Sequence, residues 1–166
     1  MNTLIYFLQY ACYYITATNK HGVHSPFVFK LLTEVIRTER FYFNRSKKNS
    51  ALISRLVSHF KPKSIVEIGS SNLSNKSMIY HQNFQNVNRE LIDFIYIKKA
   101  TTETLNFALK YMHNNSVLVI SNIHQRKQEW KCLQKHPKVN VSINLFCLGL
   151  IFLREQQNEQ HFTIRF

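Results

Sequence analysis

The stretch SIVEIGSS, residues 64–71, decides the fold because it joins a short strand to a tight turn. Its first five residues are mostly β-branched, which is typical of a strand. The turn follows at Gly69, Ser70 and Ser71, with the acidic Glu67 shortly before it. Glycine lets the backbone approach a ligand closely, and a helix that begins after such a turn offers free N–H groups to the ligand. We therefore expect a ligand-binding loop at this turn.

Downstream of this turn, strand-like and helix-like segments alternate. Near-continuous apolar runs at Leu91–Ile97 and Ser116–Ile120 predict two more strands, and helices are expected at Asn72–His81, Thr102–His113 and Gln125–Lys135. Strands that are buried on both faces and separated by helices indicate a parallel sheet. A complete strand–helix–strand unit takes roughly 30 residues, so no further strand is expected between the first of these strands and the second.

The C-terminal segments follow a different pattern. Val139–Phe146, Leu148–Arg154 and His161–Phe166 are strand-like, but the connections between them are too short for helical crossovers. These three strands should therefore be antiparallel. Taken together, the segments predict an α/β fold with a mainly parallel sheet and an antiparallel C-terminal edge.

Helices are expected to precede the sheet. The first is predicted at Thr3–Thr18, and a second begins where Ser25 can act as N-cap ahead of a proline. The interval Arg40–Asn49 is polar and basic, so it is predicted to be a connecting loop. A further helix is expected over Ala51–Phe60, where apolar residues recur at helical spacing.

Composition limits the number of domains and the cellular compartment. The chain has 166 residues, 45% of them hydrophobic, which is enough for one core. We divide it into an N-terminal helical extension, residues 1–60, and an α/β domain, residues 61–166. Three widely separated cysteines favour a reducing cytoplasm over a disulfide-bonded secreted protein. The apolar stretch Leu4–Ala17 is shorter than the roughly 20 residues that cross a bilayer, so no membrane span is expected.

The net charge of +13 favours an anionic partner, such as nucleic acid or a membrane surface. Lysine and arginine residues are nevertheless spread along the chain, with two denser patches at residues 37–48 and 126–138. In the second patch Lys127, Lys131 and Lys135 recur every four residues and share one helix face. Such a face can bind a partner or can simply be solvated, and both interpretations stay open.

Few residues offer catalytic chemistry. Hard-cation sites are built from carboxylates, but Asp93 is the only aspartate and lies at the start of a predicted strand, so no metal site is predicted. His124 follows the third predicted strand, at the edge where open parallel sheets bind ligands, and it is the candidate general base. The alternative is a structural histidine that caps the next helix or packs in its loop.

Several stretches together resemble one protein family. The N-terminal segment KHGVHSPFVF, residues 20–29, is a specific signature, and residues 63–71 match a first strand with its cofactor loop. From Asp93 to Phe166 the resemblance is almost continuous. The chain is thus similar to bacterial class I S-adenosylmethionine-dependent methyltransferases, a group related to O-methyltransferases.

The resemblance implies a Rossmann-like methyltransferase sheet, S-adenosylmethionine as cofactor and a small-molecule methyl acceptor. The family's cofactor-binding positions that carry over are Glu67, Gly69 and Ser71, with Ser70 between them. No other residue of this chain matches a cofactor-binding position of the family.

Other parts of the chain depart from the family pattern. A single glycine stands in place of a glycine-rich loop, Lys98-Lys99 replaces an Asp-Gly pair, and Ser121-Asn122 replaces paired aspartates. The strand that carries a ribose-binding acidic residue is missing, so a reduced number of strands is expected. Two hypotheses follow. One is a methyltransferase-like protein, inactive if the missing elements are essential. The other is a non-catalytic binding or structural remnant of the fold, with a basic surface for nucleic acid.

Overall fold

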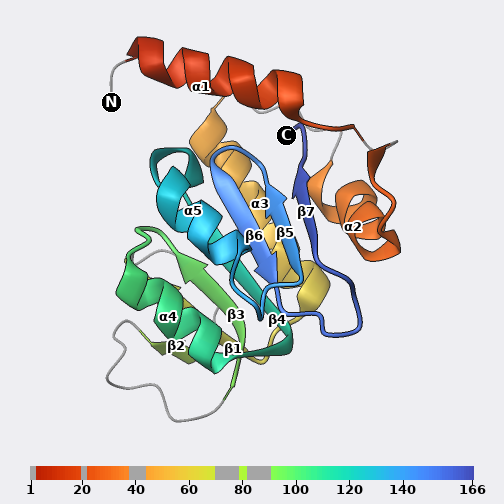
Figure 1. Cartoon of the computed structure of the whole chain (residues 1–166). Coiled ribbons are helices and arrows are strands. Elements are labelled where there is room, and N and C mark those ends of the chain that lie inside the picture. Colours follow the sequence, from red (N-terminus) through yellow and green to blue (C-terminus); the bar gives the residue numbers. More distant parts are fainter. Residues whose placement is uncertain (1–2, 20–21, 38–43, 70–78, 82–90) are drawn as a thin grey trace.

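The computed structural model describes residues 3–19, 22–37, 44–69, 79–81 and 91–166. These residues form a seven-stranded sheet with helices on both faces, and its strand order is β2-β1-β3-β4-β6-β5-β7 (Figure 1). The strands are β1 Ser64–Ile68, β2 Ile79–His81, β3 Ile92–Ile97, β4 Met112–Ser121, β5 Val141–Asn144, β6 Leu148–Phe152 and β7 Gln160–Thr163.

The helices lie near the predicted positions, and local sequence explains where several of them begin. Ser25 Oγ accepts a hydrogen bond from the Val28 N–H, which confirms the predicted N-cap. Thr101 and Thr104 form a capping box at the start of the helix that begins at Thr102. The helices are α1 Thr3–Thr16, α2 Pro26–Leu31 with a π-helical turn Leu32–Ile36, α3 Arg45–Phe60, α4 Thr102–Tyr111 and α5 Lys127–Gln134, preceded by a 3-10 turn Ile123–Gln125.

The predicted loop over Arg40–Asn49 is wrong in its second half, and its first residues lie outside the described part of the chain. α3 begins at Arg45, because Asn44 Oδ1 accepts a hydrogen bond from the Ser46 N–H at 2.8 Å and caps the helix. The Arg45 guanidinium also lies 4.5 Å from the centre of the Tyr10 ring. This tertiary contact favours a helical turn that the polar sequence by itself did not predict.

Strand pairing confirms the mainly parallel sheet. β1 pairs in parallel with β2 and β3, and β3 pairs in parallel with β4. β6 lies between β4 and β5 and is antiparallel to both, which confirms antiparallel pairing on the C-terminal side. β7 differs from expectation because it pairs with β5 in parallel. β6 already pairs with one edge of β5, so β7 can pair only with the other edge. β7 runs opposite to β6, and β6 is antiparallel to β5, so β7 is parallel to β5.

The expectation of no strand between β1 and β3 is wrong. β2 pairs with β1 in a register that runs from Ser64↔Ile79 to Val66↔His81. The last residues of the predicted helix Asn72–His81 therefore form a strand, and its residues 72–78 lie outside the described part of the chain. A strand of three residues is too short to show a periodicity in the sequence, which is why it was missed.

Helices cover both faces of the sheet (Figure 1). On one face α2, its π-helical turn and α3 pack against alternate strand residues such as Ile65, Phe94 and Val119. On the other face α4 and α5 pack against the intervening residues, among them Ile95 and Leu118. β3 and β4 are thus buried on both faces, which is why their apolar runs are nearly continuous. Within the described residues, no helix is both long and apolar enough to cross a membrane.

Gly149 allows the only tryptophan of the chain to pack directly on β6. A Cβ at this position would lie 2.4 Å from Trp130 Cζ3 and 3.0 Å from Ile123 Cγ2, which is closer than van der Waals contact. Trp130 belongs to α5 and Ile123 to the turn before it. α5 can therefore approach the sheet this closely only because residue 149 has no side chain.

We expect Gly149→Ala to lower the free energy of unfolding by about 1–3 kcal/mol, because the added methyl group overpacks the core. The double variant Gly149→Ala/Trp130→Phe should lose less than the sum of the two single changes, since the smaller ring leaves room for the methyl group. Urea unfolding followed by circular dichroism measures these losses. Strictly additive losses would contradict the proposed packing.

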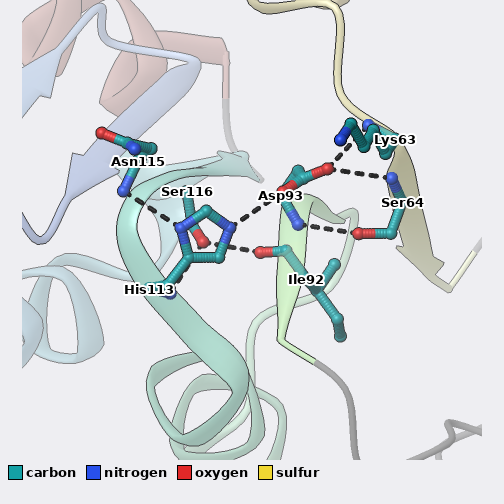
Figure 2. A network of polar contacts seen from close by, with 7 residues as sticks. All are labelled: Lys63, Ser64, Ile92, Asp93, His113, Asn115 and Ser116. Carbon is teal, nitrogen blue, oxygen red and sulfur yellow. Dashed lines mark hydrogen bonds and ion pairs between the residues drawn. The ribbon is translucent and has the colours of Figure 1, made fainter.

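Asp93 joins the starts of three strands (Figure 2). Its Oδ2 accepts hydrogen bonds from the N–H groups of Lys63 at 2.6 Å and Ser64 at 3.1 Å, where β1 begins. Its Oδ1 lies 2.8 Å from Nε2 of His113 on β4. Nδ1 of His113 accepts a hydrogen bond from the Asn115 N–H, so Nε2 carries the ring proton and donates a hydrogen bond to Asp93. This carboxylate therefore fixes the amino ends of β1, β3 and β4 relative to one another.

The hydrogen bonds of Asp93 also set its protonation. Burial by itself would raise the pKa of Asp93, but the hydrogen bonds from His113, Lys63 and Ser64 outweigh burial and hold this pKa below its ordinary value. A carboxylate whose pKa is lowered in the folded state stabilises the fold at pH values above its pKa in the unfolded chain, about 3.9. That contribution is lost as the pH falls through the lower, folded-state pKa.

Asp93→Asn should lower the free energy of unfolding at neutral pH by about 1–3 kcal/mol, because hydrogen bonds to a charged acceptor are lost. The difference from wild type should shrink as the pH falls from about 4 through the lower folded-state pKa, because the unfolded wild-type chain takes up the proton first and acid then favours unfolding. Urea titrations across this pH range measure the difference. The exposed Glu155→Gln serves as control and should stay within about 0.5 kcal/mol of wild type. A difference that stays constant into acid would rule out this role of the charge.

Candidate functional site

Loops follow the carboxyl ends of β1, β3 and β4 at one edge of the sheet. The Lys98 N–H, after β3, donates to the Ile68 carbonyl at the end of β1, with an N···O distance of 2.9 Å. Lys98 also lines one cavity together with Ser121 and Asn122, which stand at the end of β4. Open parallel sheets bind their ligands beyond the carboxyl ends of the strands, so this edge is the candidate site.

Gly69 is the described part of the predicted cofactor loop, and Ser70 and Ser71 lie outside the described residues. The φ angle of Gly69 is +92°, a conformation that other residues rarely adopt. A Cβ at Gly69 would lie 3.6 Å from Lys98 Cβ, which is an ordinary contact. The backbone conformation of the turn, more than a lack of space, therefore requires glycine here.

A row of polar side chains crosses the sheet near this edge. Glu67 is buried in β1 and is the register partner of Tyr96 in β3. The Tyr96 hydroxyl lies 2.8 Å from Ser121 Oγ at the end of β4. Burial raises the pKa of Tyr96, the Ser121 hydrogen bond opposes this rise, and the negative charge of Glu67 adds to it. Tyr96 therefore keeps its phenolic proton at neutral pH.

A cavity of about 350 Å³ adjoins this row. One wall comes from the strand ends and includes Tyr96, Lys98 and Ser121. The opposite wall comes from the N-terminal helices and includes Tyr6 of α1 and Arg45 of α3. The sequence did not assign these two residues to the site, because residues so distant along the chain meet only in the folded protein. The basic patch that contains Arg45 was the one available signal.

The cavity is positively charged. Arg45 and Lys98 line it, and no carboxylate side chain lines it among the described residues. The Arg45 guanidinium also donates a hydrogen bond to the Tyr6 hydroxyl and so links α3 to α1 across the cavity wall. A cavity with this charge attracts an anionic group and disfavours a cation.

His124 lies against the cavity but is packed among aromatic rings. Its imidazole stacks on Phe146, with ring centroids 4.7 Å apart, and meets the Tyr6 ring edge-on at 5.5 Å. Both ring nitrogens are shielded from solvent, and neither makes a hydrogen bond to another described residue. Burial lowers the pKa of His124; a polar contact with the Phe146 backbone, outside hydrogen-bond geometry, opposes this, and Arg45 and Lys127 lower the pKa further. His124 is thus a neutral, packed histidine, and its role as general base stays a prediction.

Other groups at the cavity offer little nucleophilic or metal chemistry. Burial raises the pKa of the Cys147 thiol, although the Arg45 charge and a hydrogen bond from Asn49 oppose this rise. The thiol is therefore protonated at neutral pH and is a weak nucleophile. In the described ranges, no three His, Cys, Asp or Glu side chains come close enough together to hold a metal ion.

Comparison with known proteins gives matches at the level of structure alone. No family model and no curated protein matches the sequence. A Klebsiella pneumoniae protein assigned as an O-methyltransferase aligns over 92% of this chain and 96% of its own, with 11% sequence identity and a TM-score of 0.51. The Podospora anserina methyltransferase PaMTH1, solved with bound SAH, aligns over 93% of this chain and 97% of its own, with 9% identity and a TM-score of 0.53.

These alignments span nearly the whole of each chain, so the likeness concerns the complete architecture. At such low sequence identity the likeness concerns the fold and carries no activity with it. It agrees with the mainly parallel sheet and the antiparallel β6. The chain has the fold of the class I S-adenosylmethionine-dependent methyltransferases.

Proposed function

We propose that this protein is an S-adenosylmethionine-dependent methyltransferase-like protein whose ligand cavity lies between the strand ends and the N-terminal helices. The observation that carries the proposal is the positive-φ turn at Gly69 beside the buried Glu67, at the ligand edge of a methyltransferase fold. We also propose that residues 1–60 act as a helical extension of a domain formed by residues 61–166, and that the protein is cytoplasmic.

The end of β1 fits a nucleoside cofactor in two respects. Gly69 exposes backbone without a side chain, and Glu67 provides a buried carboxylate on the same strand. We propose that Glu67, Gly69, Ser70 and Ser71 hold S-adenosylmethionine. When bound, this cofactor supplies an electrophilic methyl group to a nucleophilic acceptor.

The residues that line the cavity beside this strand end would receive a small-molecule acceptor. Arg45 and Lys98 would attract and orient an acceptor that carries a carboxylate or another anionic group. Tyr96 keeps its proton, and its hydroxyl, which lies 2.8 Å from Ser121 Oγ, can donate a hydrogen bond. Positioning of this kind is the main requirement of methyl transfer, because holding two reactants in line replaces a bimolecular encounter.

A second function is favoured by the charge of the cavity. The sulfonium group of S-adenosylmethionine is a cation, and Lys98 and Arg45 oppose a cation at this edge of the sheet. The alternative is therefore a non-catalytic binding or structural protein that keeps the fold. In that case the net charge of +13 would bind nucleic acid, and retention of the protein on DNA or RNA should fall steeply as salt is added.

Isothermal titration with S-adenosylmethionine and with its demethylated product separates the two functions. We expect saturable heat with the wild-type chain and roughly tenfold weaker binding by Gly69→Ala, because alanine strains a turn with this φ. Gly22→Ala is the matched control, since Gly22 lies outside the site and has no positive φ. An absence of heat at millimolar ligand would exclude cofactor capture and leave the non-catalytic function.

A further inference from the structure

α1 exposes an apolar side to solvent. Among the described residues, all of the exposed large apolar side chains except Phe29 and Leu91 lie on this helix. Phe7, Leu8 and Ile15 are between 60% and 80% exposed. Leu8 and Ile15 are seven residues apart, two helical turns, and therefore lie on the same side of α1. The exposed side is thus a continuous apolar strip along the helix.

The opposite side of α1 is firmly packed on the domain. Tyr13 is buried with Phe146, and Tyr6 and Tyr10 pack against them. The Tyr13 hydroxyl donates a hydrogen bond to the Ile164 carbonyl. Because these contacts hold the inner side, the apolar strip cannot turn inward. α1 contains no charged residue, and a helix that is apolar on all sides is ordinarily buried on all sides.

Basic residues lie along both flanks of α1. On one flank the exposed Lys127 and Lys131 of α5 line a cavity together with Cys12 of α1. On the other flank Arg165 donates a hydrogen bond to the Tyr14 carbonyl at 3.0 Å, and its guanidinium lies 4.1 Å from the centre of the Tyr14 ring. The apolar strip is therefore bordered by cations on a chain with a net charge of +13.

We propose that α1 docks on anionic lipid bilayers, with its apolar strip in the headgroup region and the flanking Lys127, Lys131 and Arg165 at the charged lipid heads. Helices that lie in the interface bind by burying apolar side chains while nearby cations attract anionic lipids. α1 lies along the surface in this arrangement and does not cross it. The inference is independent of the function proposed for the cavity.

Charge and size argue against a second copy of this chain as the occupant. α1 has 14 residues and is about 21 Å long, and two such helices would bury well under the roughly 800 Å² per partner of a stable interface. Two copies with a net charge of +13 would also repel each other. Nucleic acid would match the charge but would leave the apolar strip in water.

Vesicle co-sedimentation with the full chain tests the proposal. Wild type should bind vesicles of equal parts phosphatidylcholine and phosphatidylserine, and bind phosphatidylcholine vesicles roughly tenfold more weakly. Leu8→Gln/Ile15→Gln should bind the anionic vesicles roughly a hundredfold more weakly, because two apolar side chains no longer insert. Leu91→Gln changes a comparably exposed apolar residue outside α1 and should bind like wild type.

The charged flank is tested separately. Lys127→Gln/Lys131→Gln should bind the anionic vesicles roughly tenfold more weakly and with less dependence on salt. All substituted positions are exposed, so circular dichroism should be unchanged. Binding by Leu8→Gln/Ile15→Gln equal to that of wild type would overturn the proposal. The proposal would also be overturned if the wild type formed a dimer that bound no vesicles and Leu8→Gln/Ile15→Gln converted this dimer to a monomer. α1 would then pack against a second copy of the chain.

Discussion

The packing of α1 on Phe146 is the contact on which the ligand edge of the sheet depends. Phe146 stands between β5 and β6 with a φ of 68°, and its N–H donates to Asn144 Oδ1 at 2.8 Å. A side chain rarely adopts this conformation, so the turn holds it at a cost in strain. The strain presents the ring to Tyr6, Tyr10 and Tyr13 of α1. One contact thereby builds a wall of the cavity and leaves the other side of α1 exposed.

Opposite charges mark the two ends of the sheet. At the amino ends, the carboxylate of Asp93 holds the strand starts together. At the carboxyl ends, Arg45 and Lys98 line the cavity, where a nucleoside site ordinarily supplies a carboxylate to the ribose hydroxyls. The fold is that of a methyltransferase, and the charged side chains that line this cavity among the described residues are basic. Function is determined by such a site and not by the fold that carries it.

Local patterns predicted the sheet strands well and their pairing less well. The strand Ser64–Ile68 and the helix that begins at Thr102 lie where the residues indicate, because apolar periodicity and capping act over a few neighbours. β2 was missed because three residues carry no periodicity. The parallel pairing of β7 with β5 was missed because it depends on where β6 inserts, and no connection length reveals that. Arg45 was placed in a loop because its aromatic partners lie on another helix.

By itself the sequence determined the α/β class and the strand that ends in the turn at Gly69. It also showed that Asp93 is the only aspartate in the whole chain. Each of these follows from residue type or from neighbours a few positions away. Only the tertiary structure decided that Tyr6 and Arg45 close a cavity over the end of β4, and that one side of α1 remains exposed. These outcomes depend on packing between segments distant along the chain, which no local pattern contains.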